Sequence, residues 1–237
     1  MSLNSGILTY GKENISYRVF YVGRKTLEIA VHPDGSVVIK APLGSEYEEV
    51  RKIVAKRARW IKRQLDYFAQ FNPRTPQRQY IGGETHLYLG RQYRLKIVTG
   101  DKDEIKLTRG YFRVTVKENP AYEKVEKLLE DWYLEKAAEK FGESFERCWP
   151  HFGKHLLAKP RMRIRRMKKR WGSLSKSGTL TLNADLIRAP KECIDYVVTH
   201  ELCHLRYHDH SPAFFQLLEK IMPDWEKRKH KMELALV

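Results

Sequence analysis

Hydrophobic and polar residues alternate through the first part of the chain in the manner of β-strands. Between Ile7 and Ala41, β-branched and aromatic residues alternate with polar ones, and a turn signal stands at His32-Pro33-Asp34-Gly35. This pattern predicts a short antiparallel meander. Residues 80–98 and 104–117 return to strand character between glycine turns, so most of the β-structure is expected before residue 118.

Helical spacing of apolar residues marks the segments between and after these strands. A capping box at Ser45 and Glu48 predicts the start of one long helix that runs to Phe68. Asn119-Pro120 opens a second long helix, which is expected to end near Cys148.

The C-terminal third predicts a small sheet followed by helices. Strand character extends over residues 161–182, and Pro190 then begins an apolar helix that continues through residues 200–204. Ser211-Pro212 and Pro223 each mark the start of a further helix.

This order of elements indicates the α+β class. We expect a β-rich subdomain over residues 1–118 and a compact core over residues 119–237, or one continuous domain. The core should hold a long backing helix, a small sheet, the helix through residues 200–204 and C-terminal helices. No internal repeat and no low-complexity tract is evident.

The composition indicates in which part of the cell the protein is expected. No apolar run reaches the length of about 18 residues that a membrane span needs, and the first residues lack a secretory pattern, so we expect no membrane association. Cys148, Cys193 and Cys203 are odd in number and show no paired spacing. A cytoplasmic, reducing location fits best.

Net charge is the unusual bulk property. The chain carries 45 Lys and Arg against 29 Asp and Glu, a formal charge of +16. Such an excess favours an anionic partner, while a solvated basic surface is an equally good explanation.

The motif H-E-x-x-H stands at His200, Glu201 and His204 within the apolar helix. On a helix, two histidines four residues apart lie on one face, about 6 Å apart, so both rings can reach one metal ion. Glu201 lies beside them and can act as the general base toward a metal-activated water. The motif therefore predicts one catalytic zinc ion.

A catalytic zinc needs a third protein ligand, and His208 and His210 stand downstream. If the helix continued to His208, three histidines would be strung along about 12 Å, too far to converge. His210 adjoins Ser211-Pro212, where the chain leaves one helix for the next and can turn back. His210 is therefore the expected ligand, and His208 is either a surface residue or a donor to the substrate oxyanion.

Several phrases together resemble the YgjP-like metallopeptidases, relatives of the SprT and Spartan zinc proteases. They are HELCH at 200–204, HSPAF at 210–214, RWGS at 170–173, and LTLN at 180–183 leading to Leu186-Ile187. Ala41-Pro42 and residues 87–95 extend the resemblance over nearly the whole chain.

The resemblance implies a minimal zincin core with His200, His204 and His210 as zinc ligands and Glu201 as catalytic base. Leu174 stands where the family usually has cysteine, so any role of that thiol is absent here. Tyr207 stands where the metzincin pattern has glycine, which favours the minimal zincin.

Arg170, Trp171, Gly172 and Ser173 are expected to form an edge strand that pairs with an extended peptide substrate. Equally, Trp171 can pack in the core and Gly172 can simply turn the chain. The basic run just upstream, with Arg163, Arg165, Lys168 and Lys169, is a candidate contact for DNA or RNA, or an ordinary solvated face.

Three functions follow, in order of preference. The first is a zinc metallopeptidase that hydrolyses protein or peptide substrates. The second is a metal-dependent hydrolase of nucleotides or other phosphate esters, because an activated water also attacks phosphorus. The third is a nucleic-acid-binding protein with a structural metal, although such a site would not require Glu201.

Overall fold

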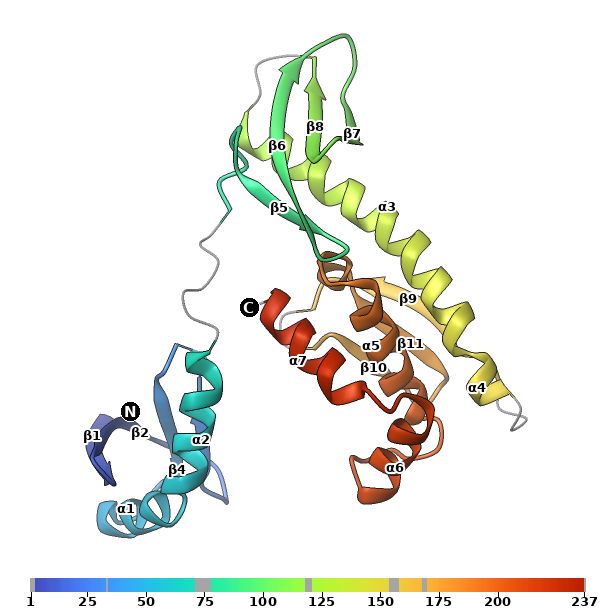
Figure 1. Cartoon of the computed structure of the whole chain (residues 1–237). Coiled ribbons are helices and arrows are strands. Elements are labelled where there is room, and N and C mark those ends of the chain that lie inside the picture. Colours follow the sequence, from blue (N-terminus) through green and yellow to red (C-terminus); the bar gives the residue numbers. More distant parts are fainter. Residues whose placement is uncertain are drawn as a thin grey trace. The chain divides into compact units, whose positions relative to one another are not determined.

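The computed structural model describes residues 3–32, 34–70, 78–117, 121–153, 158–167 and 170–236. The chain divides into two compact units, Met1–Thr75 and Pro76–Val237 (Figure 1). This division lies earlier than the boundary expected after residue 118, because the second β-sheet packs on the long helix α3 and shares its core.

The first unit is a four-stranded sheet with two helices on one face. Its elements are β1 (Leu3–Tyr10), β2 (Glu13–Val22), β3 (Glu28–Val31), β4 (Val37–Pro42), α1 (Tyr47–Lys56) and α2 (Ala58–Ala69). Alternate residues of β2 and β4, among them Val19 and Ile39, are buried beneath α1 and α2. The expected antiparallel meander is only partly correct, because β2 and β4 pair in parallel.

The one long helix expected here is broken at Arg57, between α1 and α2. The capping box is also wrong: Glu46 is the N-cap of α1, and no side chain caps the helix. Val50 and Val54 of α1 and Ile61 of α2 face the sheet, so the break lets both helices follow the twisted surface.

The second unit begins with another four-stranded sheet and continues into the core. Its sheet strands are β5 (Thr85–Tyr88), β6 (Arg91–Thr99), β7 (Glu104–Thr108) and β8 (Tyr111–Val116). The helix α3 (Tyr122–Cys148) starts beside this sheet and runs on past the core, and α4 (Pro150–Gly153) follows it (Figure 1). The expected end near Cys148 is confirmed, whereas Asn119-Pro120 lies outside the described residues.

The core follows the expected order of elements. It comprises β9 (Arg161–Arg165), β10 (Gly172–Leu174), β11 (Thr179–Asn183), a 3-10 helix η1 (Ala184–Arg188), α5 (Lys191–Cys203), α6 (Pro212–Ile221) and α7 (Trp225–Leu236). β11 pairs with β10 antiparallel and with β9 in parallel, so β10 is an edge strand of this three-stranded sheet. The α+β class is confirmed, with helices concentrated in the C-terminal part.

The sheets of the two units share one topology. Their strand orders are β1-β2-β4-β3 and β5-β6-β8-β7. In each sheet the central pair is parallel and both outer pairs are antiparallel. Each sheet is followed by a helix that begins at a tyrosine, Tyr47 in α1 and Tyr122 in α3. The expectation of no internal repeat is therefore wrong: one ββββα module occurs twice.

The repeat extends to single positions. Gly35 and Gly110 correspond in the last hairpin of each copy, whereas Gly11 and Gly90 are the first and the second residue of the two-residue turn in the first hairpin; all four have positive φ. Buried positions correspond as Val37 and Phe112, Ile39 and Val114, Ala41 and Val116, Val50 and Val125, and Val54 and Leu129. Few of these pairs are identical, so residue-by-residue similarity is weak although the pattern of burial is the same.

The second copy supports the helix that carries the histidines. At the β5–β6 turn, the N–H groups of Leu89 and Gly90 donate to the carbonyls of Ile187 and Arg188, at 3.0 and 2.9 Å. A Cβ at Gly90 would lie 2.6 Å from Cγ of Pro190, the N-cap of α5. The absence of a side chain at Gly90 therefore lets the hairpin contact the start of α5.

Candidate active site

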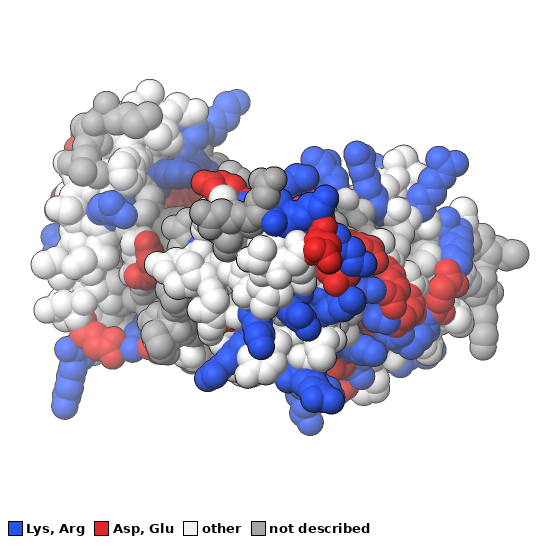
Figure 2. Space-filling view, turned by 90° about the horizontal axis from the view of Figure 1, so that it is seen from above, with Lys and Arg blue, Asp and Glu red and all other residues white. Residues whose placement is uncertain are grey.

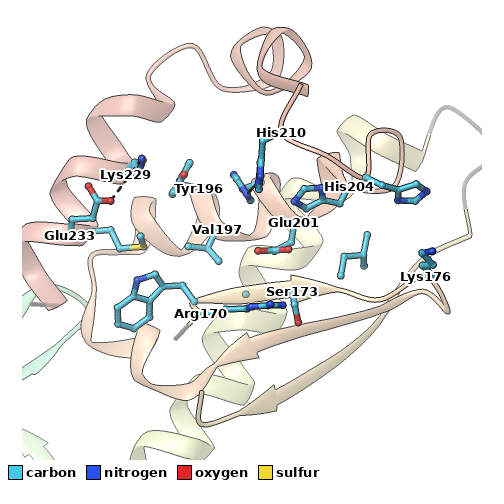
Figure 3. A pocket seen from close by; sticks show the side chains of 16 residues that line it. Arg170, Ser173, Lys176, Tyr196, Val197, Glu201, His204, His210, Lys229 and Glu233 are labelled. Carbon is cyan, nitrogen blue, oxygen red and sulfur yellow. Dashed lines mark hydrogen bonds and ion pairs between the residues drawn. The ribbon is translucent and has the colours of Figure 1, made fainter. Parts of the chain in front are cut away.

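Three imidazoles converge where α5 ends and α6 begins. His200 lies on the last turn of α5, His204 is its C-cap, and His210 precedes α6 (Figure 3). One nitrogen from each ring lies within 4.8 Å of the others, and Nε2 of His200 is 3.0 Å from Nε2 of His210. Among the described residues, no other group of three or more His, Cys, Asp or Glu side chains lies close enough together to hold a metal ion.

The chain leaves α5 as the sequence requires. The helix ends at Cys203, and backbone turns through Leu205, Arg206 and Tyr207 redirect the chain toward α6. This turn returns His210 to the other two histidines. His208 is exposed and lines the same pocket, but it is not part of the cluster.

Neighbouring groups fix the rings. Nδ1 of His204 lies 2.9 Å from the carbonyl of Tyr207, which accepts its hydrogen and leaves Nε2 as the free lone pair. The fully buried ring of Phe214 packs against all three imidazoles, with centroid distances of 4.7 to 4.9 Å. Phe214 was not singled out from the sequence, although it lies in the HSPAF phrase.

Burial favours the neutral form of His200 and His210. Burial lowers the pKa of His200 to about 3, and nearby His210 and His204 add to the shift. Burial, followed by His204, also lowers the pKa of His210. A neutral imidazole with a free nitrogen is the form that coordinates a metal, so this donor set fits a divalent ion such as zinc.

Glu201 belongs to α5, and its side chain lies against β10 with only 8% of the residue's surface exposed (Figure 3). Burial raises the pKa of its carboxyl group to about 7, against the smaller opposing effects of the Leu174 N–H and the charge of Arg170. A Cβ at Gly172 would lie 2.7 Å from Cγ of Glu201. Gly172 therefore makes room for this carboxylate, a reason that the sequence alone did not reveal.

The strand beside Glu201 is organised by Asn183. The buried amide of Asn183 donates to the carbonyls of Met167 and Arg170, and its oxygen accepts from the N–H of Met167. Its own backbone N–H donates to the carbonyl of Trp171. These bonds hold the segment that leads into β10.

A pocket of about 660 Å³ joins these parts. Arg170, Trp171, Gly172 and Ser173 all line it, and Trp171 also packs partly against the core. The opposite wall was missed in the sequence: it comes from α5 and α7 and comprises Tyr196, Val197, Lys229, Met232 and Glu233. Lys229 and Glu233 form an ion pair at 3.9 Å (Figure 3).

The basic strip is partly described. Arg163 and Arg165 are exposed on β9, while Met162 and Ile164 alternate with them and are half-buried, as expected. Lys168 and Lys169 lie outside the described residues. Across the face in Figure 2, basic side chains are widely spread and acidic ones lie among them.

Comparison with protein families places the chain among the peptidase hydrolases that depend on a metal ion. The matching family model is described as "YgjP-like, metallopeptidase domain" and covers residues 25–235. The chain therefore belongs to the YgjP-like metallopeptidase family, and its substrates are proteins or peptides.

Two solved structures are partly similar. The metallopeptidase zymogen abylysin of Pyrococcus abyssi is 29% identical, with a TM-score of 0.34, over 38% of this chain and 87% of that one. The metallopeptidase zymogen jannalysin of Methanocaldococcus jannaschii is 19% identical, with a TM-score of 0.37, over 41% and 91%. No curated protein matches the chain. No described helix is long and apolar enough to cross a membrane.

Proposed function

We propose that this metallopeptidase uses one zinc ion, bound by His200, His204 and His210, with Glu201 as general base. The observation that supports this most is the approach of three imidazole nitrogens to within 4.8 Å of one another, beside a buried carboxylate. A zinc ion bound there would supply Lewis acidity toward a peptide carbonyl and toward water.

The protein's own groups would then hold and move the proton. Glu201 accepts the proton of the attacking water and passes it to the leaving amine, and its raised pKa of about 7 suits both roles near neutral pH. The Leu174 N–H and the space left by Gly172 keep the carboxylate in place.

We propose that β10 binds the substrate as an added strand. Within the described sheet, β10 pairs with β11 alone, so its other edge can accept an extended peptide beside Glu201. Arg170, Trp171, Gly172 and Ser173 would form this edge, and the wall made by α5 and α7 would receive side chains of the substrate.

Metal analysis combined with activity profiling tests the proposed function. The purified protein should contain about one zinc per chain and cleave unfolded protein substrates, and a chelator should abolish cleavage. Hydrolysis of nucleotides without peptide cleavage would instead support a phosphate ester hydrolase. Zinc content without either activity would indicate a structural metal.

We also keep two narrower proposals. The three cysteines are buried and free, which fits a reducing, cytoplasmic location.

Arg163 and Arg165 are exposed and, among the described residues, form no ion pair with an acid, which leaves them available for DNA or RNA. Salt-sensitive DNA binding that weakens in Arg163→Glu would support this contact, and equal binding would exclude it.

A further inference from the structure

The sheet of strands β5 to β8 in the second unit has a covered face and an open face. Leu95 of β6 and Phe112 of β8 lie on the face that packs against α3, and both are buried. Residues that alternate with them along the strands point to the opposite face. The exposed residues of this open face include Arg94 and Lys96 on β6, Lys106 on β7, and Tyr111 and Arg113 on β8.

Three cations of the open face lie side by side. Arg113 is the register partner of Lys96 on β6 and of Lys106 on β7. These three residues form a basic row across three strands, with about 4.8 Å between one strand and the next. Like charges at directly opposite positions repel each other and destabilise a sheet. The stability of the fold therefore gives no reason for the basic row.

The acids of the sheet lie at one end and leave most of this charge unpaired. Glu104 is the one acid within the four strands, and it pairs with Lys106 at 2.9 Å. Asp101 and Asp103 stand in the β6–β7 loop, at the same end of the sheet as Glu104. Within the described part of the chain, no ion pair is formed by Arg94, Lys96 and Arg113.

Tyr111 adds an aromatic surface beside the basic row. It stands two residues before Arg113 on the same face of β8, and its register partners are Arg94 on β6 and Thr108 on β7. The residue is 42% exposed. An exposed ring among cations can stack on an unpaired base while the cations contact the phosphates on either side of it.

The first copy of the ββββα module shows that the fold does not require these side chains. The row that corresponds to the basic row consists of Arg18, Val38 and Ala30, and so contains one cation. Ser36 stands at the position of Tyr111. The same topology is thus built without a basic row and without an exposed ring, so both belong to the surface of the second sheet alone.

We propose that the open face of the second sheet binds single-stranded nucleic acid, with Tyr111 stacked on a base and the cations of β6 and β8 facing the phosphates. The four strands carry none of the metal-binding histidines, so this binding goes beyond the proposed peptidase chemistry. It is also independent of the contact proposed on β9.

The test uses the full chain and fluorescent oligothymidylate and oligouridylate of about 12 nucleotides. Fluorescence anisotropy should show saturable binding of one or both, and the affinity should fall as salt is added. Lys96→Glu should weaken binding on the order of tenfold and lower the salt slope by about 1, because a phosphate contact is lost. Arg18→Glu, an equal charge change at the corresponding position of the first copy, should bind as the wild type does.

Tyr111→Ala separates stacking from charge. It should also weaken binding on the order of tenfold, but with the salt slope of the wild type, because a stacked base is lost and no charge is removed. Circular dichroism checks that each variant is folded, without reference to peptidase activity.

Several outcomes would overturn the proposal. Wild-type binding by Lys96→Glu would do so, and so would an equal loss in Lys96→Glu and Arg18→Glu, which would indicate attraction by the net charge alone. Duplex DNA that binds as tightly as the single strands would exclude stacking on unpaired bases. Failure of both oligonucleotides to bind, or tighter binding of polyglutamate than of either, would also exclude nucleic acid as the partner, and the second result would indicate an acidic protein.

Discussion

Glu201 combines burial with a position beside a cluster of histidines, and this combination gives the first prediction. Glu201→Gln keeps the size of the side chain and removes its basicity. Hydrolysis should fall by about a hundredfold or more, whereas zinc content, measured by metal mass spectrometry, should equal that of the wild type. Wild-type turnover in this variant would show that another group is the base.

His208 and His210 both follow α5, but only His210 is proposed to bind zinc. His210→Ala should reduce zinc affinity more than about tenfold, because losing a ligand costs at least as much as losing a residue that only supports one. His208→Ala is the matched control, since His208 lines the same pocket outside the cluster. Competition with a chromogenic chelator measures both, and the reverse ranking would identify His208 as the ligand.

Gly172 of β10 lets this strand lie against the Glu201 side chain of α5. Gly172→Ala places a Cβ 2.8 Å from Oε1 of Glu201, so the carboxylate must shift and hydrolysis should fall at unchanged zinc content. Gly142→Ala is the control, because nothing lies within 4 Å of its Cβ and alanine favours the α3 helix by about 0.5–1 kcal/mol. Wild-type hydrolysis by the Gly172→Ala protein would contradict the proposed contact.

The second sheet buries His86 beneath Tyr80 and Phe112, and this burial predicts a pH dependence of stability. Burial lowers the pKa of His86 to about 4, despite the opposing charge of Glu84, so the unfolded chain binds a proton that the folded chain excludes. The contribution of neutral, buried His86 to the free energy of unfolding should therefore be fully present above about pH 6.5. It should be lost as the pH falls from there to about 4, and the loss should be at most about 3 kcal/mol.

Urea unfolding at several pH values, compared between the wild type and His86→Phe, tests this effect. The aromatic replacement keeps ring contacts with Tyr80 and Phe112 and removes the titrating group. The two proteins should differ in their pH dependence over this range. If the free energy of unfolding changed with pH equally in both proteins, carboxylates elsewhere would account for the pH dependence.

The sequence predicted the kind of most elements and the residues of the histidine cluster. Residue spacing is local, so a helix with H-E-x-x-H and a following Ser211-Pro212 turn could be inferred directly. Alternation along a strand shows which face is buried but not which strand it pairs with, so the parallel pairing of β2 and β4 was missed. The wall at Lys229 and Glu233 was missed because tertiary packing alone brings α7 to α5.

The whole molecule contains two hydrophobic cores with separate memberships. Ile39→Ala, at a fully buried position of the first core, should lower the free energy of unfolding of the first unit by about 2–5 kcal/mol. Calorimetry should show one unfolding transition at a lower temperature and a second transition, which zinc raises, at its wild-type temperature. Ile194→Ala in the second core should have the reverse effect, and a single transition that shifts in both variants would contradict independent units.

Buried free cysteines give this chain an internal chemical reporter. Cys148, Cys193 and Cys203 are all within the second unit, and burial raises the pKa of each thiol, so the reactive thiolate is scarce and shielded. An alkylating reagent can reach them only when the second core opens. The rate of alkylation in the native enzyme thus measures how often the peptidase core opens, whatever the first unit is doing.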